Sequence, residues 1–167
     1  MNDFNTCDLC DAHKTDSDGA FRVLPPRFHD YGTRRKFFGP ISTVQCFEDN
    51  SLVKAALDAP GLGRVLVVDG GSSLRRALLG GNLGAAATRN GWAGVVIDGA
   101  VRDADELAAC DIGIRALALM PMPPLKHNEG RSGIAVQIQG VSVRPGEWLY
   151  ADVDGIVVMP QGAVPHG

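Results

Sequence analysis

Three short apolar runs, separated by segments of helical character, constrain the fold of this chain most strongly. They are Arg64–Asp69, Gly94–Asp98 and Arg115–Met120. Strands of a parallel sheet that are covered on both faces have continuous apolar runs of this kind. Helices are expected between the runs at Leu83–Asn90 and Asp103–Cys110. This alternation predicts a parallel sheet with right-handed crossovers.

Shorter elements flank this core on both sides. Before it, the sequence predicts a helix over 5–13, a strand over Ile41–Phe47 and a helix that Asn50 caps and that continues through Asp58. Residues 14–40 are polar and rich in turn formers, which indicates a long surface connection. Four strand-like runs follow later in the chain: Ile134–Ile138, Val141–Val143, Trp148–Ala151 and Ile156–Met159.

The expected fold class is α/β, with a central, partly parallel sheet flanked by helices and a β-rich C-terminal layer packed against it. A chain of 167 residues with 45% hydrophobic and 21% charged residues is typical of one globular domain. We expect this domain over residues 1–160 and a flexible tail over 161–167.

The charge balance and the hydropathy exclude some classes of protein. The net charge is −3 and no face is dense in lysine or arginine, which disfavours direct binding to nucleic acid. The chain has no 18-residue apolar segment of the kind that spans a membrane, and its first residues lack the pattern of a signal peptide. A cytoplasmic location is therefore expected.

Three charged residues follow the second apolar run and form the first candidate site. Arg102 and Asp103 are adjacent, and Glu106 comes three positions later. Two carboxylates at this spacing on a helix suit a hard divalent cation such as Mg²⁺ or Mn²⁺, and a neighbouring guanidinium can neutralise an anionic substrate. The same spacing is that of an ordinary capping box with Asp103 as N-cap. Spacing alone leaves both interpretations open.

A glycine pair forms the second candidate site. Gly80 and Gly81 precede Asn82 and Leu83 at the expected start of a helix. Exposed backbone N–H groups at a helix N-terminus favour an anion such as a carboxylate or a phosphate. A tight turn with Asn82 as N-cap is the simpler alternative. The chain has neither G-x-x-x-x-G-K-[ST] nor G-x-G-x-x-G after its first strand, which disfavours ATP and NAD.

The cysteines and histidines carry weaker signals. Cys7 and Cys10 have C-x-x-C spacing, but no second pair completes a zinc site, and two partly buried thiols on a short helix explain them. His29 and His127 fall in expected loops and are weak candidates for proton transfer. Neither group identifies a site by itself.

Several blocks of the chain, in the right order, resemble the class II aldolase/RraA-like family over roughly residues 5 to 160. This family includes regulators of ribonuclease activity and 4-hydroxy-4-methyl-2-oxoglutarate aldolases. Its catalytic members carry a glycine, then Arg-Asp twenty-one positions later, then an acid, and Gly81, Arg102, Asp103 and Glu106 match this pattern. The matching blocks are Thr6–Ala12, Phe37–Val44, Cys46–Asn50, Gly80–Leu83, Asp98–Asp103, Pro145–Trp148 and Ala151–Ile156.

The resemblance implies a role for each of these residues. Asp103 and Glu106 would hold a divalent cation (Mg²⁺ or Mn²⁺) and its water shell. Arg102 would contact the 2-oxo acid and stabilise an enolate. The backbone of Gly80, Gly81, Asn82 and Leu83 would bind the carboxylate of the pyruvyl group. The family also implies a compact β/β/α swivelling-type fold and a homotrimer.

The function implied by the resemblance is a metal-dependent C–C lyase. It would cleave 4-hydroxy-4-methyl-2-oxoglutarate into two pyruvates and decarboxylate oxaloacetate as a side activity. The alternative is a non-catalytic regulator that inhibits an endoribonuclease of the RNase E type by protein–protein contact. A menaquinone methyltransferase, also associated with this family, is disfavoured because the chain has no glycine-rich loop for S-adenosylmethionine.

Overall fold

The computed structural model describes residues 3–160 of the chain. Its centre is a parallel block of four strands in the order β3-β4-β6-β7, which confirms the α/β prediction. Every residue of β4 and β6 is buried, because helices cover one face of the block and a small hairpin covers the other. In these described residues, no helix is both long and apolar enough to cross a membrane.

The helices are α1 (Thr6–His13), α2 (Ser51–Leu57), α3 (Gly81–Arg89) and α4 (Ala104–Ala108). The strands of the parallel block are β3 (Phe37–Gln45), β4 (Val65–Asp69), β6 (Gly94–Val101) and β7 (Gly113–Leu119). The other strands are β1 (Arg22–Val23), β2 (His29–Asp30), β5 (Ala77–Leu79), β8 (Arg131–Ser132), β9 (Val136–Ile138), β10 (Val141–Val143), β11 (Trp148–Asp152) and β12 (Gly155–Met159).

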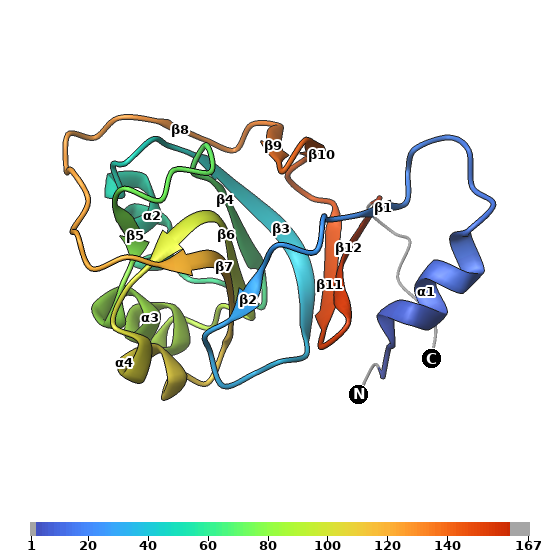
Figure 1. The fold of residues 1–167 in the computed structure, drawn as a ribbon, viewed down its shortest axis with the longest axis horizontal. Helices are drawn as coiled ribbons and strands as arrows, with labels where there is room; N and C mark the ends of the chain where they lie inside the picture. Colours follow the sequence, from blue (N-terminus) through green and yellow to red (C-terminus); the bar gives the residue numbers. More distant parts are fainter. Residues whose placement is uncertain (1–2, 161–167) are drawn as a thin grey trace.

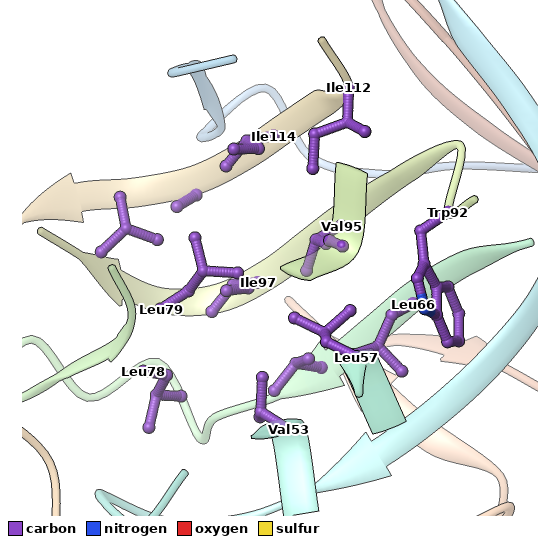
Figure 2. Packing of buried hydrophobic residues seen from close by; sticks show 14 of the residues in the cluster. Val53, Leu57, Leu66, Leu78, Leu79, Trp92, Val95, Ile97, Ile112 and Ile114 are labelled. Carbon is purple, nitrogen blue, oxygen red and sulfur yellow. The ribbon is translucent and has the colours of Figure 1, made fainter. Parts of the chain in front are cut away.

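Alternate residues of the central strands face two separate hydrophobic clusters. Leu66 of β4 and Ile97 of β6 pack with Val53 and Leu57 of α2 on the helical side (Figure 2). Val67, on the other face of β4, packs against the β9–β10 hairpin. This alternation follows from the period of two in a strand. It confirms that a β-rich C-terminal layer packs on the parallel half.

Antiparallel strands extend the sheet away from helices α2, α3 and α4. β11 pairs with β3, β12 pairs with β11 and β1 pairs with β12. Helix α1 packs against this extension, at the opposite end of the molecule from α2, α3 and α4 (Figure 1). The backbone N–H and the hydroxyl of Thr6, the first residue of α1, both donate to the Asp152 carboxylate at the end of β11.

The structure corrects several predicted boundaries. β3 begins at Phe37 and not at Ile41, because Phe37–Pro40 pairs with β11. The predicted connection over 14–40 accordingly also contains β1 and β2. Asn50 precedes α2 but makes no side-chain cap bond; the Asp49 carboxylate accepts the Ser51 N–H there.

A further difference concerns the strand that leads to the first candidate site. β6 continues to Val101, so Asp98 lies inside the strand and Arg102 comes directly after it. The Asp98 carboxylate is buried and accepts hydrogen bonds from Ser72 and Gln139. The charged residues of interest therefore stand at the carboxyl end of a parallel strand, where α/β proteins place ligands. The predicted tail at 161–167 lies outside the described residues.

Candidate active site

One small cavity brings the two candidate sites together. Its volume is about 240 Å³, somewhat below the range of about 300–1,000 Å³ that is usual for drug-sized ligands. It lies where β5 leads into α3 and β6 leads into α4. The predicted residues that line it are Gly80, Gly81, Asn82, Leu83, Arg102 and Asp103.

The first wall of the cavity is the start of helix α3. The helix begins at Gly81, with Gly80 as its N-cap residue, so the predicted start at Leu83 was two residues late. Asn82 lies within the helix and does not cap it. Among the described residues, the backbone N–H groups of Asn82 and Leu83 have no hydrogen-bond acceptor. Such unpaired groups, together with the helix dipole, favour an anion at this point.

The second wall is the turn between β6 and α4, and its geometry corrects the capping-box interpretation. Asp103 has a left-handed backbone conformation, with φ of 63°, and its side chain makes no cap bond to α4. Its Oδ2 atom accepts the backbone N–H of Gly81 at 2.9 Å. A non-glycine residue with positive φ carries a conformational cost, and such residues are enriched at functional sites. Asp103 thus joins the two walls.

The glycine pair leaves room for both carboxylates. A Cβ atom on Gly80 would lie 2.6 Å from Asp103 Oδ2, and one on Gly81 would lie 1.6 Å from Glu106 Oε2. Glu106 does not line the cavity, but its carboxylate packs directly on the Gly81 backbone. The spacing that links Gly81 to Asp103 and Glu106 in sequence therefore corresponds to contact in space, and Arg102 lies against the adjacent Gly80.

Replacing Gly81 with alanine is expected to lower turnover at this site by about tenfold, because the added methyl group displaces the Glu106 carboxylate. The added methyl group would also lie 2.8 Å from Glu106 Cβ, so a modest fall in the thermal midpoint is expected as well. The checks are kcat/KM and the thermal midpoint of each variant. Gly155→Ala is the matched control, because its Cβ would meet no atom within 4 Å. Equal activity of the two variants would contradict this role for Gly81.

Arg102 supplies the positive charge of the second wall. Its backbone N–H donates to the Leu79 carbonyl, which fixes it beside the β5–α3 turn. Its side chain is half-buried, lies against Gly80 and makes a long contact of 3.4 Å with the Pro121 carbonyl. Because a guanidinium carries five N–H donors, most of its hydrogen-bonding capacity is available to a ligand.

Three further polar residues of the cavity escaped the sequence-based prediction of the site. Lys54 comes from α2, Asn50 directly precedes that helix, and Lys126 comes from the loop after β7. Asn50 was expected only as a helix cap. No spacing pattern separates Lys54 or Lys126 from ordinary surface lysines, so only the fold could identify them. In the part of the chain that the structure describes, Lys54, Lys126 and Arg102 give the cavity wall three cationic side chains against one carboxylate, that of Asp103.

The cysteine and histidine candidates lie elsewhere. Cys7 and Cys10 line a different cavity, between α1 and the β11–β12 turn. The negative charge of Asp154 raises the pKa of Cys7, and burial raises that of Cys10, so neither thiol has the low pKa of a reactive cysteine. His29 lies in β2 at the sheet edge, and His127 is exposed in a loop; neither lines the cavity.

The carboxylates of Asp103 and Glu106 suit Mg²⁺ better than zinc. Within residues 3–160, no group of three or more histidine, cysteine or acidic side chains is placed to hold a metal. A structural or catalytic zinc site needs three or four protein ligands. Mg²⁺ instead keeps several waters and is held by one or two carboxylates together with the substrate. Asp103 and Glu106 suit that second arrangement.

Comparison with known proteins identifies the family. The sequence profile of the RraA-like family, described as Aldolase/RraA, matches residues 6–158. The chain belongs to the RraA-like family. A relative from Albidiferax ferrireducens, provisionally named a 4-hydroxy-4-methyl-2-oxoglutarate aldolase, is 68% identical over 93% of this chain and 94% of its own length.

Solved structures of RraA-like proteins share the fold. The RNA-processing inhibitor RraA from Thermus is 43% identical, with a TM-score of 0.91, over 99% of this chain and 97% of that one. A Geobacillus kaustophilus protein, described as an S-adenosylmethionine:2-dimethylmenaquinone methyltransferase, is 41% identical, also with a TM-score of 0.91, over 98% and 100% of the two chains. The names of RraA-like proteins therefore cover three different functions.

Proposed function

We propose that this RraA-like protein is a divalent-metal-dependent lyase that acts on 2-oxo acids. The substrate of choice is 4-hydroxy-4-methyl-2-oxoglutarate, which gives two pyruvates. The observation that carries the proposal is the convergence of Arg102, Asp103 and the unpaired N–H groups of α3 on one small cavity. The provisional aldolase name of the Albidiferax relative supports the same activity.

Each wall has a role in binding the pyruvyl half of the substrate. The N–H groups of Asn82 and Leu83 receive its carboxylate. Arg102 donates to the 2-oxo oxygen and stabilises the negative charge that develops there when the enolate forms. Asp103 and Glu106 hold the divalent cation and its waters. When bound, that cation supplies Lewis-acid polarisation of the 2-oxo group.

The proposed reaction breaks the bond between C3 and C4 of the substrate. The C4 hydroxyl gives up its proton to water, and C4 becomes the keto carbon of one pyruvate. The electron pair of the broken bond stays on C3 as the enolate of the second pyruvate, which Arg102 stabilises until C3 is protonated to a methyl group. Oxaloacetate loses CO₂ to give the same enolate without any hydroxyl deprotonation, so we propose its decarboxylation as a side activity.

A direct assay of pyruvate release tests this function. Purified protein with Mg²⁺ or Mn²⁺ is incubated with 4-hydroxy-4-methyl-2-oxoglutarate, and pyruvate is followed by its reduction with lactate dehydrogenase and NADH. Two pyruvates per substrate are expected. Absence of pyruvate with either metal, from protein that is folded by circular dichroism, would contradict the proposed activity.

The second candidate is a regulator that binds an endoribonuclease of the RNase E type. The similarity to the Thermus RNA-processing inhibitor favours it. A pull-down between the two purified proteins, followed by an RNA-cleavage assay, tests it. Inhibition by a protein that turns over no 2-oxo acid would favour the regulator. The methyltransferase function fits poorly, because a cavity of about 240 Å³ is small for S-adenosylmethionine.

We also propose that the protein assembles as a homotrimer. Exposed apolar side chains, Leu119, Met122 and Leu125, border the segment that carries Pro123 and Pro124 into the cavity wall. Exposed apolar residues that lie close together often mark a protein–protein interface. Light scattering after size-exclusion chromatography gives the molar mass, for which three times 17.6 kDa is expected.

A further inference from the structure

Helix α2 forms a cavity wall that the pyruvyl half of the substrate does not need. Asn50 directly precedes α2, the backbone N–H of Lys54 one turn later donates to its carbonyl, and both residues line the cavity. The carboxylate and the 2-oxo group of a pyruvyl unit are already provided for by α3 and Arg102. The α2 wall is therefore available to the other half of a longer ligand.

A hydrogen bond fixes the position of α2 relative to the turn between β5 and α3. Asn50 is only 7% exposed, and its Nδ2 atom donates to the carbonyl of Leu78 at 3.2 Å. Leu78 lies two residues before Gly80, which begins the turn. This bond joins the N-terminus of α2 to β5 and so holds Lys54 at a set place along the cavity.

The ammonium group of Lys54 has N–H donors that no described residue accepts. Its ammonium group contacts one protein acceptor among the described residues, Asp58 Oδ2 at 2.5 Å on the same helix. An ammonium carries three N–H donors, so two are free. The Lys54 side chain is 57% exposed, which allows the flexible chain to reach toward the cavity without losing its hydration.

The charges of the cavity wall point to a ligand with more than one negative group. Among residues 3–160, Asp103 is the one carboxylate that lines it, whereas Arg102, Lys54 and Lys126 are cationic. Backbone N–H groups of α3 bind the pyruvyl carboxylate, and Arg102 binds the 2-oxo oxygen. The charges of the lysines therefore remain to favour a second carboxylate at the other end of the substrate.

We propose that Lys54 is a specificity-determining residue that binds the distal carboxylate of a 2-oxo dicarboxylate. This inference rests on the proposed function, because it assumes that the pyruvyl half occupies the α3 wall. Lys54 selects substrates with a second carboxylate over simple 2-oxo acids, and it takes no part in the chemistry at the 2-oxo group.

Binding measurements test this role without requiring turnover. The dissociation constants of 2-oxoglutarate, which has two carboxylates, and of pyruvate, which has one, are measured by calorimetry with Mg²⁺ present. Lys54→Gln is expected to weaken the binding of 2-oxoglutarate by about twofold to fivefold, the size of an exposed ion pair, and to leave the binding of pyruvate unchanged. Lys54→Arg should retain most of the preference because it keeps the charge.

The matched control is Lys14→Gln, which removes an exposed lysine that follows α1, far from the cavity. It should bind both ligands as the wild type does. The proposal would be overturned if Lys54→Gln weakened the binding of both ligands equally, or if its dissociation constants equalled those of the wild type. It would also be overturned if the wild type bound neither ligand. Failure of the lyase function is a separate result, namely binding without pyruvate release from 4-hydroxy-4-methyl-2-oxoglutarate.

Discussion

Replacing Arg102 with alanine is expected to lower kcat/KM for pyruvate release by about 100- to 1,000-fold. A donor aimed at the oxygen where negative charge develops contributes about this factor in other enzymes. The fold should survive, because the Arg102 side chain makes only the long contact with the Pro121 carbonyl in the described structure. Steady-state kinetics, with circular dichroism of each variant, measure both effects.

An arginine at the far end of α3 provides the control for this variant. Arg89 lies in the last turn of that helix, is exposed and does not line the cavity. Arg89→Ala should therefore retain wild-type kcat within a few-fold. Arg102→Lys keeps the charge but loses the planar fork of donors, so intermediate activity is expected. An Arg102→Ala enzyme within tenfold of the wild type would contradict the proposed role.

Replacing Asp103 with asparagine is expected to raise the metal concentration needed for half-maximal activity by about 100-fold, since one of two protein carboxylates is lost. The asparagine oxygen can still accept the Gly81 N–H, so the join between the two walls is kept. This substitution therefore separates the charge of Asp103 from its structural contact. Titration of activity with Mg²⁺ and Mn²⁺ measures the shift.

Asp105→Asn is the matched control for Asp103→Asn. Asp105 lies two residues later in the first turn of α4, is exposed and does not line the cavity. Its loss removes the same charge from the same helix, so any effect of net charge alone appears in both variants. Identical metal titrations for the two variants would show that Asp103 does not hold the cation.

The central sheet could be predicted because its strands are buried on both faces. β4 and β6 are continuous apolar runs for this reason, and helices separate them in the sequence. The first part of β3 could not be predicted from local sequence, because Phe37–Pro40 contains glycine and proline and becomes a strand by pairing with β11. Its partner lies more than 100 residues away, for example Trp148 opposite Pro40.

The sequence predicted which residues of the β5–α3 and β6–α4 turns line the cavity, apart from Glu106, but not the geometry that joins them. A capping box was the simpler local explanation of Asp103 and Glu106, and it fails because the left-handed backbone at Asp103 turns its carboxylate toward Gly81. The need for glycine at Gly80 and Gly81 follows from how closely the two carboxylates approach them. Lys54 carries no local signal, since only the packing of α2 brings it to the cavity.

Removal and return of the metal test the central claim most directly. Pyruvate release from 4-hydroxy-4-methyl-2-oxoglutarate by the wild-type protein should fall to background in excess EDTA and recover when Mg²⁺ or Mn²⁺ is added beyond the chelator. Asp103→Asn should recover only at much higher metal concentration. Undiminished turnover of the wild type in excess EDTA would contradict a metal-dependent lyase at this site.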